Sequence, residues 1–195
     1  MVRRRLLATS VLGLLASAAY AADPCAGPGP SCAVAEAEKA WTNLVPQNGT
    51  GQTFTAAGRW ITGIEVFIVT GNAREGETDT LTLSVSSFRG DLLAEARQTV
   101  ESGQAGWLCF ALPRGGIEVT PGETLVLRLR DTGKVIFGWR YGQDTYPRGH
   151  ALMRNRPERA FDFAFRVHDA TAEPDGKGTG VELGVTFGKF TITRQ

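Results

Sequence analysis

The sequence gathers side chains of the kinds that bind ligands in residues 139–150. This stretch reads Trp-Arg-Tyr-Gly-Gln-Asp-Thr-Tyr-Pro-Arg-Gly-His, so aromatic rings stand close to side chains that donate or accept hydrogen bonds. A sugar ring presents an apolar C–H face and a rim of hydroxyl groups, and an aromatic platform with polar neighbours suits it. We therefore take eight residues as ligand-binding candidates: Trp139, Arg140, Tyr141, Gln143, Asp144, Tyr146, Arg148 and His150.

More than one aromatic side chain could form the platform. Trp139 and Tyr141 share the alternation of Phe137, so both can instead belong to a buried face of a strand. Tyr146 lies beyond that alternation and is the better candidate for an exposed ring. Trp60 is a second candidate, again with a core position as the alternative. A local basic run follows the stretch: Arg154, Arg156 and Arg159. Such a run usually belongs to a solvated loop, and the more specific alternative is that it binds an acidic polymer.

The residues that could catalyse a reaction form no recognised pattern. The sequence contains no Gly-x-Ser-x-Gly, His-Glu-x-x-His, phosphate-loop or dinucleotide-binding motif. Only His150 and His168 could act as imidazole bases, and both are expected to be ordinary polar residues. A glycosidase would need two converging carboxylates, and none of the 20 acidic residues stands in a recognisable pair. We expect a non-catalytic protein without a resident cofactor; Asp79 or Asp91 could hold a structural calcium ion, although no spacing singles them out.

Three cysteines leave at least one thiol outside any disulfide within the chain. Cys25 and Cys32 flank Ala-Gly-Pro-Gly-Pro-Ser, a turn that can bring the two sulfurs together. We expect these two to form a disulfide. Cys109 lies in an alternating segment and is expected to be a small, reduced strand residue.

The first 21 residues are typical of a secretory signal peptide. Three arginines at positions 3–5 precede an apolar stretch, and Ala19 and Ala21 are the small residues that a signal peptidase requires. The mature protein is expected to begin at Ala22 and to be secreted or periplasmic, with no transmembrane segment. The alternative is an uncleaved anchor, because residues 6–22 reach the lower limit of about 17 residues for a membrane span.

Alternating apolar residues predict the fold. Five segments place apolar side chains at every second position: Ile64, Val66 and Ile68; Leu81, Leu83 and Val85; Leu125, Leu127 and Leu129; Phe137, Trp139 and Tyr141; Phe161, Phe163 and Phe165. Gly- and Pro-rich turns separate these segments, and no crossover helices intervene, which favours antiparallel sheets. We expect an all-β, two-sheet β-sandwich, most simply a jelly roll, over residues 51–195. A leader at residues 22–50 would carry a short helix near residues 33–41, and two last strands are expected at 181–187 and 190–192.

Residues 52–168 resemble bacterial extracellular jelly-roll domains of the kind related to carbohydrate-binding modules. The resemblance is carried by a Gln-Thr-Phe-Thr opening, a Gly-Trp-Leu-Cys-Phe strand, a Pro-Gly-Glu-Thr-Leu hairpin and a closing Phe-Asp-Phe-Ala-Phe strand. These are core and turn residues, so they specify a fold more closely than a ligand.

Net charge limits the classes of partner. The chain carries +1 overall, and removing the three N-terminal arginines leaves 18 basic and 20 acidic residues. Such a balance supplies no field that would attract nucleic acid. We expect a secreted ligand-binding domain whose partner is a glycan or another cell-envelope component. A structural or adhesive envelope protein that binds another protein is the alternative, and a glycan-active hydrolase is the third possibility.

Overall fold

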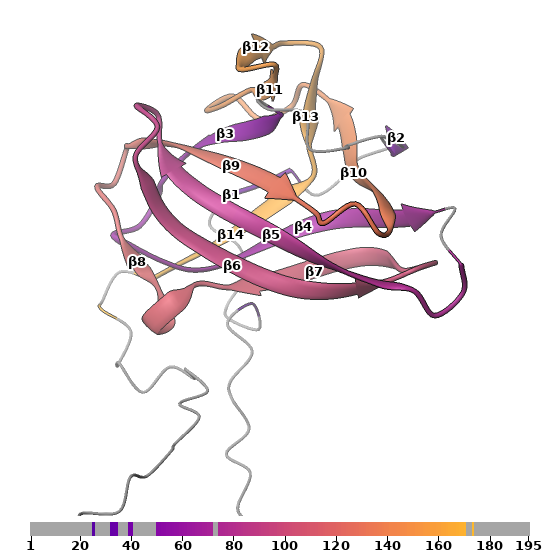
Figure 1. The fold of residues 1–195 in the computed structure, drawn as a ribbon. Helices are drawn as coiled ribbons and strands as arrows, with labels where there is room; N and C mark the ends of the chain where they lie inside the picture. Colours follow the sequence, from indigo (N-terminus) through magenta and orange to yellow (C-terminus); the bar gives the residue numbers. More distant parts are fainter. Residues whose placement is uncertain are drawn as a thin grey trace, which may run out of the picture.

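The computed structural model describes residues 25, 32–34, 39–40, 50–71, 74–170 and 173, with the backbone alone at 32–34 and 39–40. Within these residues the chain forms two antiparallel β-sheets packed face to face (Figure 1). This confirms the predicted all-β sandwich. The predicted signal peptide, its cleavage site and the two last expected strands lie outside the described residues.

The first sheet is built around the long strand β4 (Trp60–Gly71). One edge of β4 pairs with β7 (Ala105–Ala111) and β8 (Ile117–Glu118), and the opposite edge pairs with β14 (Phe165–Ala170) and β10 (Ile136–Gln143). Three short strands extend the β14 and β10 side: β1 (Cys32–Val34), β2 (Lys39–Ala40) and β13 (Phe161–Phe163).

The second sheet has β3 and β9 at its centre. Its strands lie in the order β12 (Arg156–Glu158), β11 (Ala151–Met153), β3 (Gly51–Thr55), β9 (Thr124–Arg130), β5 (Thr78–Ser87) and β6 (Leu92–Glu101). β5 and β6 form a long hairpin whose turn lies beside the beginning of β9, because Ser87 pairs with Leu125. The single helical element of the described part is η1 (Pro113–Gly115), so no helix there is long enough to cross a membrane.

The core lies between the two sheets and uses the alternation of the sequence. Ile64, Val66 and Ile68 of β4 are fully buried in one cluster with Leu81 and Leu83 of β5. Burying one such side chain contributes roughly 1.5–3 kcal/mol, so these rows supply much of the driving force for packing the sheets together. The intervening Thr and Ser residues of β5 remain partly exposed on the outer face.

Part of the predicted N-terminal helix is wrong. Residues 33–34 belong to β1 and residues 39–40 belong to β2, while the rest of the predicted helix lies outside the described residues. Ala, Glu and Lys are good helix formers, but helix propensity is small compared with tertiary interactions. Here the backbone groups pair with β14 and β10 instead of with one another.

The predicted disulfide is also wrong, because Cys25 is bonded to Cys109. Cys109 alternates with the buried Phe110, so it lies on the outer face of the first sheet rather than in the core. Cys32 is the third cysteine, and it lies in β1, on the opposite side of β4 from β7. The expected ring of Cys25 and Cys32 followed from closeness in sequence, whereas the fold joins two cysteines that are 84 residues apart.

Candidate functional site

The stretch at residues 139–150 is mainly a structural element. Trp139 is fully buried and stacks on Phe163 with ring centroids 4.4 Å apart. Its indole Nε1–H donates to the carbonyl oxygen of Ala164 at 2.8 Å. Of the two roles considered for Trp139, the structure therefore supports a core residue. Its ring is not accessible to a ligand.

The prediction that Tyr146 forms an exposed platform is wrong. Its exposed fraction is 8%, and its ring meets Phe165 edge-on at 5.3 Å. The backbone N–H of Thr55 donates to the Tyr146 hydroxyl oxygen at 3.1 Å. The loop also packs closely on β3, since a Cβ at Gly149 would stand 2.0 Å from the Thr53 carbonyl oxygen. Tyr146 is therefore packed into the sandwich, by its ring against Phe165 and by its hydroxyl group against β3.

A buried carboxylate holds this loop in place. Asp162 is fully buried and accepts hydrogen bonds from the backbone N–H groups of Thr145 and Tyr146 and from the side-chain amide of Gln52. Burial raises the pKa of Asp162 above its ordinary value, and the charge of Asp144 adds to the effect, while these three hydrogen bonds oppose it. The cost of burying this group is offset by the backbone groups that it satisfies.

The remaining predicted residues do not form a common site. Tyr141 is half-buried against Phe161, with ring centroids 4.8 Å apart, and the guanidinium of Arg140 lies 4.3 Å from the centre of the Phe67 ring. The backbone of His150 bonds to Thr53. The exposed polar residues are Gln143, Asp144 and Arg148, and they have no exposed aromatic ring of this stretch beside them. Trp60 is half-buried. Of the basic run, Arg154 and Arg156 are exposed on the β11–β12 hairpin, and Arg159 is exposed just after it.

Asp79, one of the two residues suggested for a calcium ion, uses its carboxylate to hold the loop before β10. Its carboxylate accepts from the backbone N–H groups of Thr80, Thr132, Lys134 and Val135 and from the hydroxyl of Thr132. Burial by itself raises the pKa of Asp79, but the hydrogen bonds outweigh it and lower the pKa to about 2. A cation would have to displace these donors. No group of three or more potential metal ligands occurs among the described residues.

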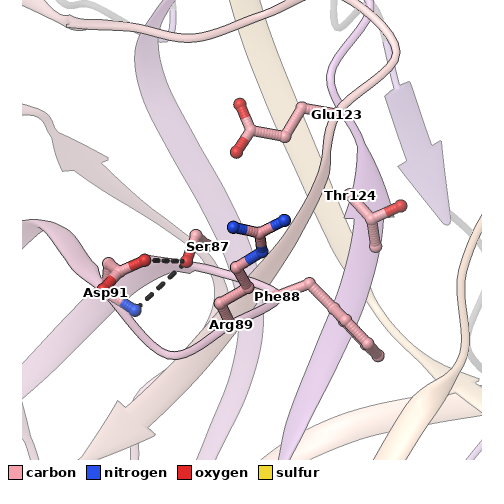
Figure 2. A pocket seen from close by; sticks show the side chains of 6 residues that line it. All are labelled: Ser87, Phe88, Arg89, Asp91, Glu123 and Thr124. Carbon is pink, nitrogen blue, oxygen red and sulfur yellow. Dashed lines mark hydrogen bonds between the residues drawn. The ribbon is translucent and has the colours of Figure 1, made fainter.

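A surface pocket of about 520 Å³ lies at a place that sequence analysis did not single out. It is lined by residues of the β5–β6 turn and by the beginning of β9: Ser87, Phe88, Arg89, Asp91, Glu123 and Thr124. Figure 2 shows the Arg89 guanidinium directed toward Glu123, whereas the Phe88 side chain extends away from these two. The pocket combines one exposed aromatic ring with hydroxyl, guanidinium and carboxylate groups.

Hydrogen bonds within the turn fix the shape of one wall of the pocket. The Ser87 hydroxyl donates to Asp91 Oδ2 at 3.0 Å and accepts from the Asp91 backbone N–H at 3.1 Å. The backbone closes the same turn, because Ser87 N–H donates to the Asp91 carbonyl and Gly90 N–H donates to the Ser87 carbonyl. Gly90 has φ +102°, which a residue with a side chain rarely adopts. Phe88 is therefore held outward, with an exposed fraction of 66%.

The other wall is set by the turn before β9. Glu123 accepts a hydrogen bond from the Thr120 backbone N–H through Oε2, and its own N–H donates back to the Thr120 carbonyl. Its backbone carbonyl accepts from Ala56, which ties the turn to the end of β3. These hydrogen bonds hold Glu123 in place at the wall of the pocket that faces the β5–β6 turn.

One signal in the sequence points to this pocket. Positions 80, 82, 84 and 86 of β5 are Thr or Ser on the outer face, and Phe88 continues the same parity with a large apolar side chain. An aromatic residue at an outward position beside a turn is the pattern that an exposed platform would produce. That Glu123 stands beside it follows only from the pairing of β5 with β9.

Comparison with known proteins adds no family: no known family matches the chain, and no curated protein is similar enough to be counted as a relative.

Proposed function

We propose that this protein is a secreted, non-catalytic β-sandwich domain that binds carbohydrate through the pocket at the β5–β6 turn. The observation that carries the proposal is the exposure of Phe88 beside five polar residues in one pocket. An aromatic face offers the apolar side of a sugar ring a stacking surface, and the neighbouring groups suit its hydroxyls. Residues 52–168 also resemble bacterial extracellular jelly-roll domains, which in turn are similar to carbohydrate-binding modules.

Export is part of the proposal. The signal-like first 21 residues support it, and so does the Cys25–Cys109 disulfide, since such bonds persist in oxidising compartments. The periplasm and the cell exterior both meet this condition.

The two acidic residues of the pocket favour binding over hydrolysis. A glycosidase needs one carboxylic acid that burial keeps protonated near neutral pH. Asp91 is exposed and holds its own turn through Ser87, while Glu123 holds the turn before β9. Each carboxylate has a structural partner, and neither stands in an apolar environment of the kind that produces a general acid.

Binding of another protein is the second candidate function. The β5–β6 hairpin lies at the edge of its sheet and exposes three large apolar side chains, with exposed fractions of 66% for Phe88, 61% for Leu92 and 39% for Leu93. Edge strands with exposed apolar residues can pair with or pack against other chains. Replacement of Leu92 by Asp separates the two functions, because Leu92 does not line the pocket.

A glycan array probed with the exported full-length protein tests the proposal. We expect binding to at least one glycan class, and we expect Phe88→Ala to weaken it by about 10- to 100-fold, the loss for one large apolar contact. Ile136→Ala is the matched control, because Ile136 is 46% exposed and lies on β10, in the other sheet. Absence of glycan binding would refute the proposal, as would binding that survives Phe88→Ala. Release of reducing sugar from a bound glycan would refute the non-catalytic assignment.

A further inference from the structure

Charge in the β5–β6 pocket limits the class of sugar that it can hold. The pocket is lined by two carboxylates, Asp91 and Glu123, and by one guanidinium, Arg89. None of the three belongs to an ion pair within the described part of the chain. The pocket therefore carries a net negative charge.

Two carboxylate oxygens that line the pocket accept no hydrogen bond from a described residue. Ser87 occupies Oδ2 of Asp91 and Thr120 occupies Oε2 of Glu123, whereas no described residue donates to Asp91 Oδ1 or Glu123 Oε1. Ionised carboxylates accept and do not donate, so a bound molecule must bring O–H or N–H donors to these two oxygens. Sugar hydroxyls are such donors, and carboxylate or sulfate substituents are not.

Arg89 and Phe88 set two further conditions on a bound molecule. No described residue accepts a hydrogen bond from the Arg89 side chain, so its N–H groups can donate to ring or hydroxyl oxygens of a sugar. Phe88 needs an uncharged C–H face over its ring, because the face of an aromatic ring is itself negative. An anionic substituent would approach Arg89 only in the neighbourhood of Asp91 and Glu123.

We infer that the pocket binds non-anionic saccharides through their hydroxyl groups and discriminates against uronic and sulfated ones. This inference rests on the proposed function, because it assigns a ligand class to the same pocket. The exposed arginine run at 154–159 differs from this pocket, because its positive charge would favour anionic saccharides.

Paired oligosaccharides of equal length test the inference by calorimetry. Each pair has the same configuration and linkage, one member neutral and the other its uronic form, in the gluco, galacto and manno series. We expect the neutral member of a binding pair to bind at least about tenfold more tightly at about 20 mM salt. The ratio should shrink at about 500 mM salt, where exposed charges are screened over a few ångströms.

Glu123→Gln provides the matched variant, because it removes one charge and keeps the size of the side chain. We expect it to strengthen binding of the uronic member and to weaken that of the neutral member, so that the ratio falls by about fivefold or more. Glu75→Gln is the control for charge alone, since Glu75 is exposed in the connection between β4 and β5, away from the pocket lining. The control should leave the ratio unchanged.

The outcomes separate the inference from the proposed function. Uronic binding that equals or exceeds neutral binding and is lost in Phe88→Ala overturns the inference and leaves the proposed function standing. No binding of any pair, in agreement with an unresponsive glycan array, overturns both. A neutral preference that Glu123→Gln does not change overturns the assignment of the preference to the pocket carboxylates.

Discussion

Asp79 provides the sharpest test of how this sandwich is held together. Its carboxylate fastens the connection between β9 and β10 to the beginning of β5 through four hydrogen bonds, from Thr132, Lys134 and Val135. A fifth comes from the neighbouring backbone N–H of Thr80. The pKa of Asp79 falls from the ordinary value of 3.8 to about 2, and a tenfold change in acidity corresponds to about 1.4 kcal/mol. The ionised carboxylate therefore contributes about 2–3 kcal/mol to the free energy of unfolding.

We expect Asp79→Asn to lower the free energy of unfolding by about 2–3 kcal/mol at pH 7. The amide keeps the size of the side chain, but its NH2 group faces backbone N–H donors and cannot accept from them. Urea unfolding followed by tryptophan fluorescence measures the difference.

The pH dependence of that difference tests its electrostatic origin. Because the pKa of Asp79 is lower in the folded state, its contribution is fully present above the unfolded value of 3.8 and is lost as the pH falls toward about 2. The gap between the wild-type protein and Asp79→Asn should therefore shrink between pH 4 and pH 2. Glu75→Gln, which removes an exposed charge, serves as the control. A gap that stays constant over this pH range, or one below about 0.5 kcal/mol at pH 7, would refute the reasoning.

Two further predictions concern the disulfide and the buried tyrosine. Peptide mapping without reduction should find Cys25 linked to Cys109, and Cys25→Ala should lower the free energy of unfolding by about 2–5 kcal/mol, since the bond closes a long loop. A peptide linking Cys25 to Cys32 would contradict this pairing. Tyr146→Ala should lower the free energy of unfolding by about 3–5 kcal/mol, and Tyr146→Phe by about 1 kcal/mol, because the hydrogen bond from Thr55 is lost while the ring stays packed. Thermal or urea unfolding measures both, and a loss below about 1 kcal/mol for Tyr146→Ala would show that its ring is not packed as described.

The arrangement of inner and outer residues could be predicted from the sequence because alternation is a local property of an extended chain. Successive side chains of a strand point to opposite faces, so Leu81, Leu83 and Val85 had to share one face and the intervening Thr and Ser residues the other. The same parity places Phe88 on the outer side. The all-β class and the two-sheet packing follow from several such rows, which one sheet could not bury by itself.

Only the tertiary structure decided which distant segments meet. Tyr146 lies outside any alternating row, and it is buried because Asp162 and Gly149 bring its loop onto the sandwich. Cys109 bonds to Cys25 rather than remaining reduced because the fold brings these residues to a Cα–Cα distance of 6.2 Å. The pocket exists because the β5–β6 turn and Glu123 are neighbours through the pairing of β5 with β9. Pairing of remote strands depends on the packing of the whole core, and no local spacing encodes it.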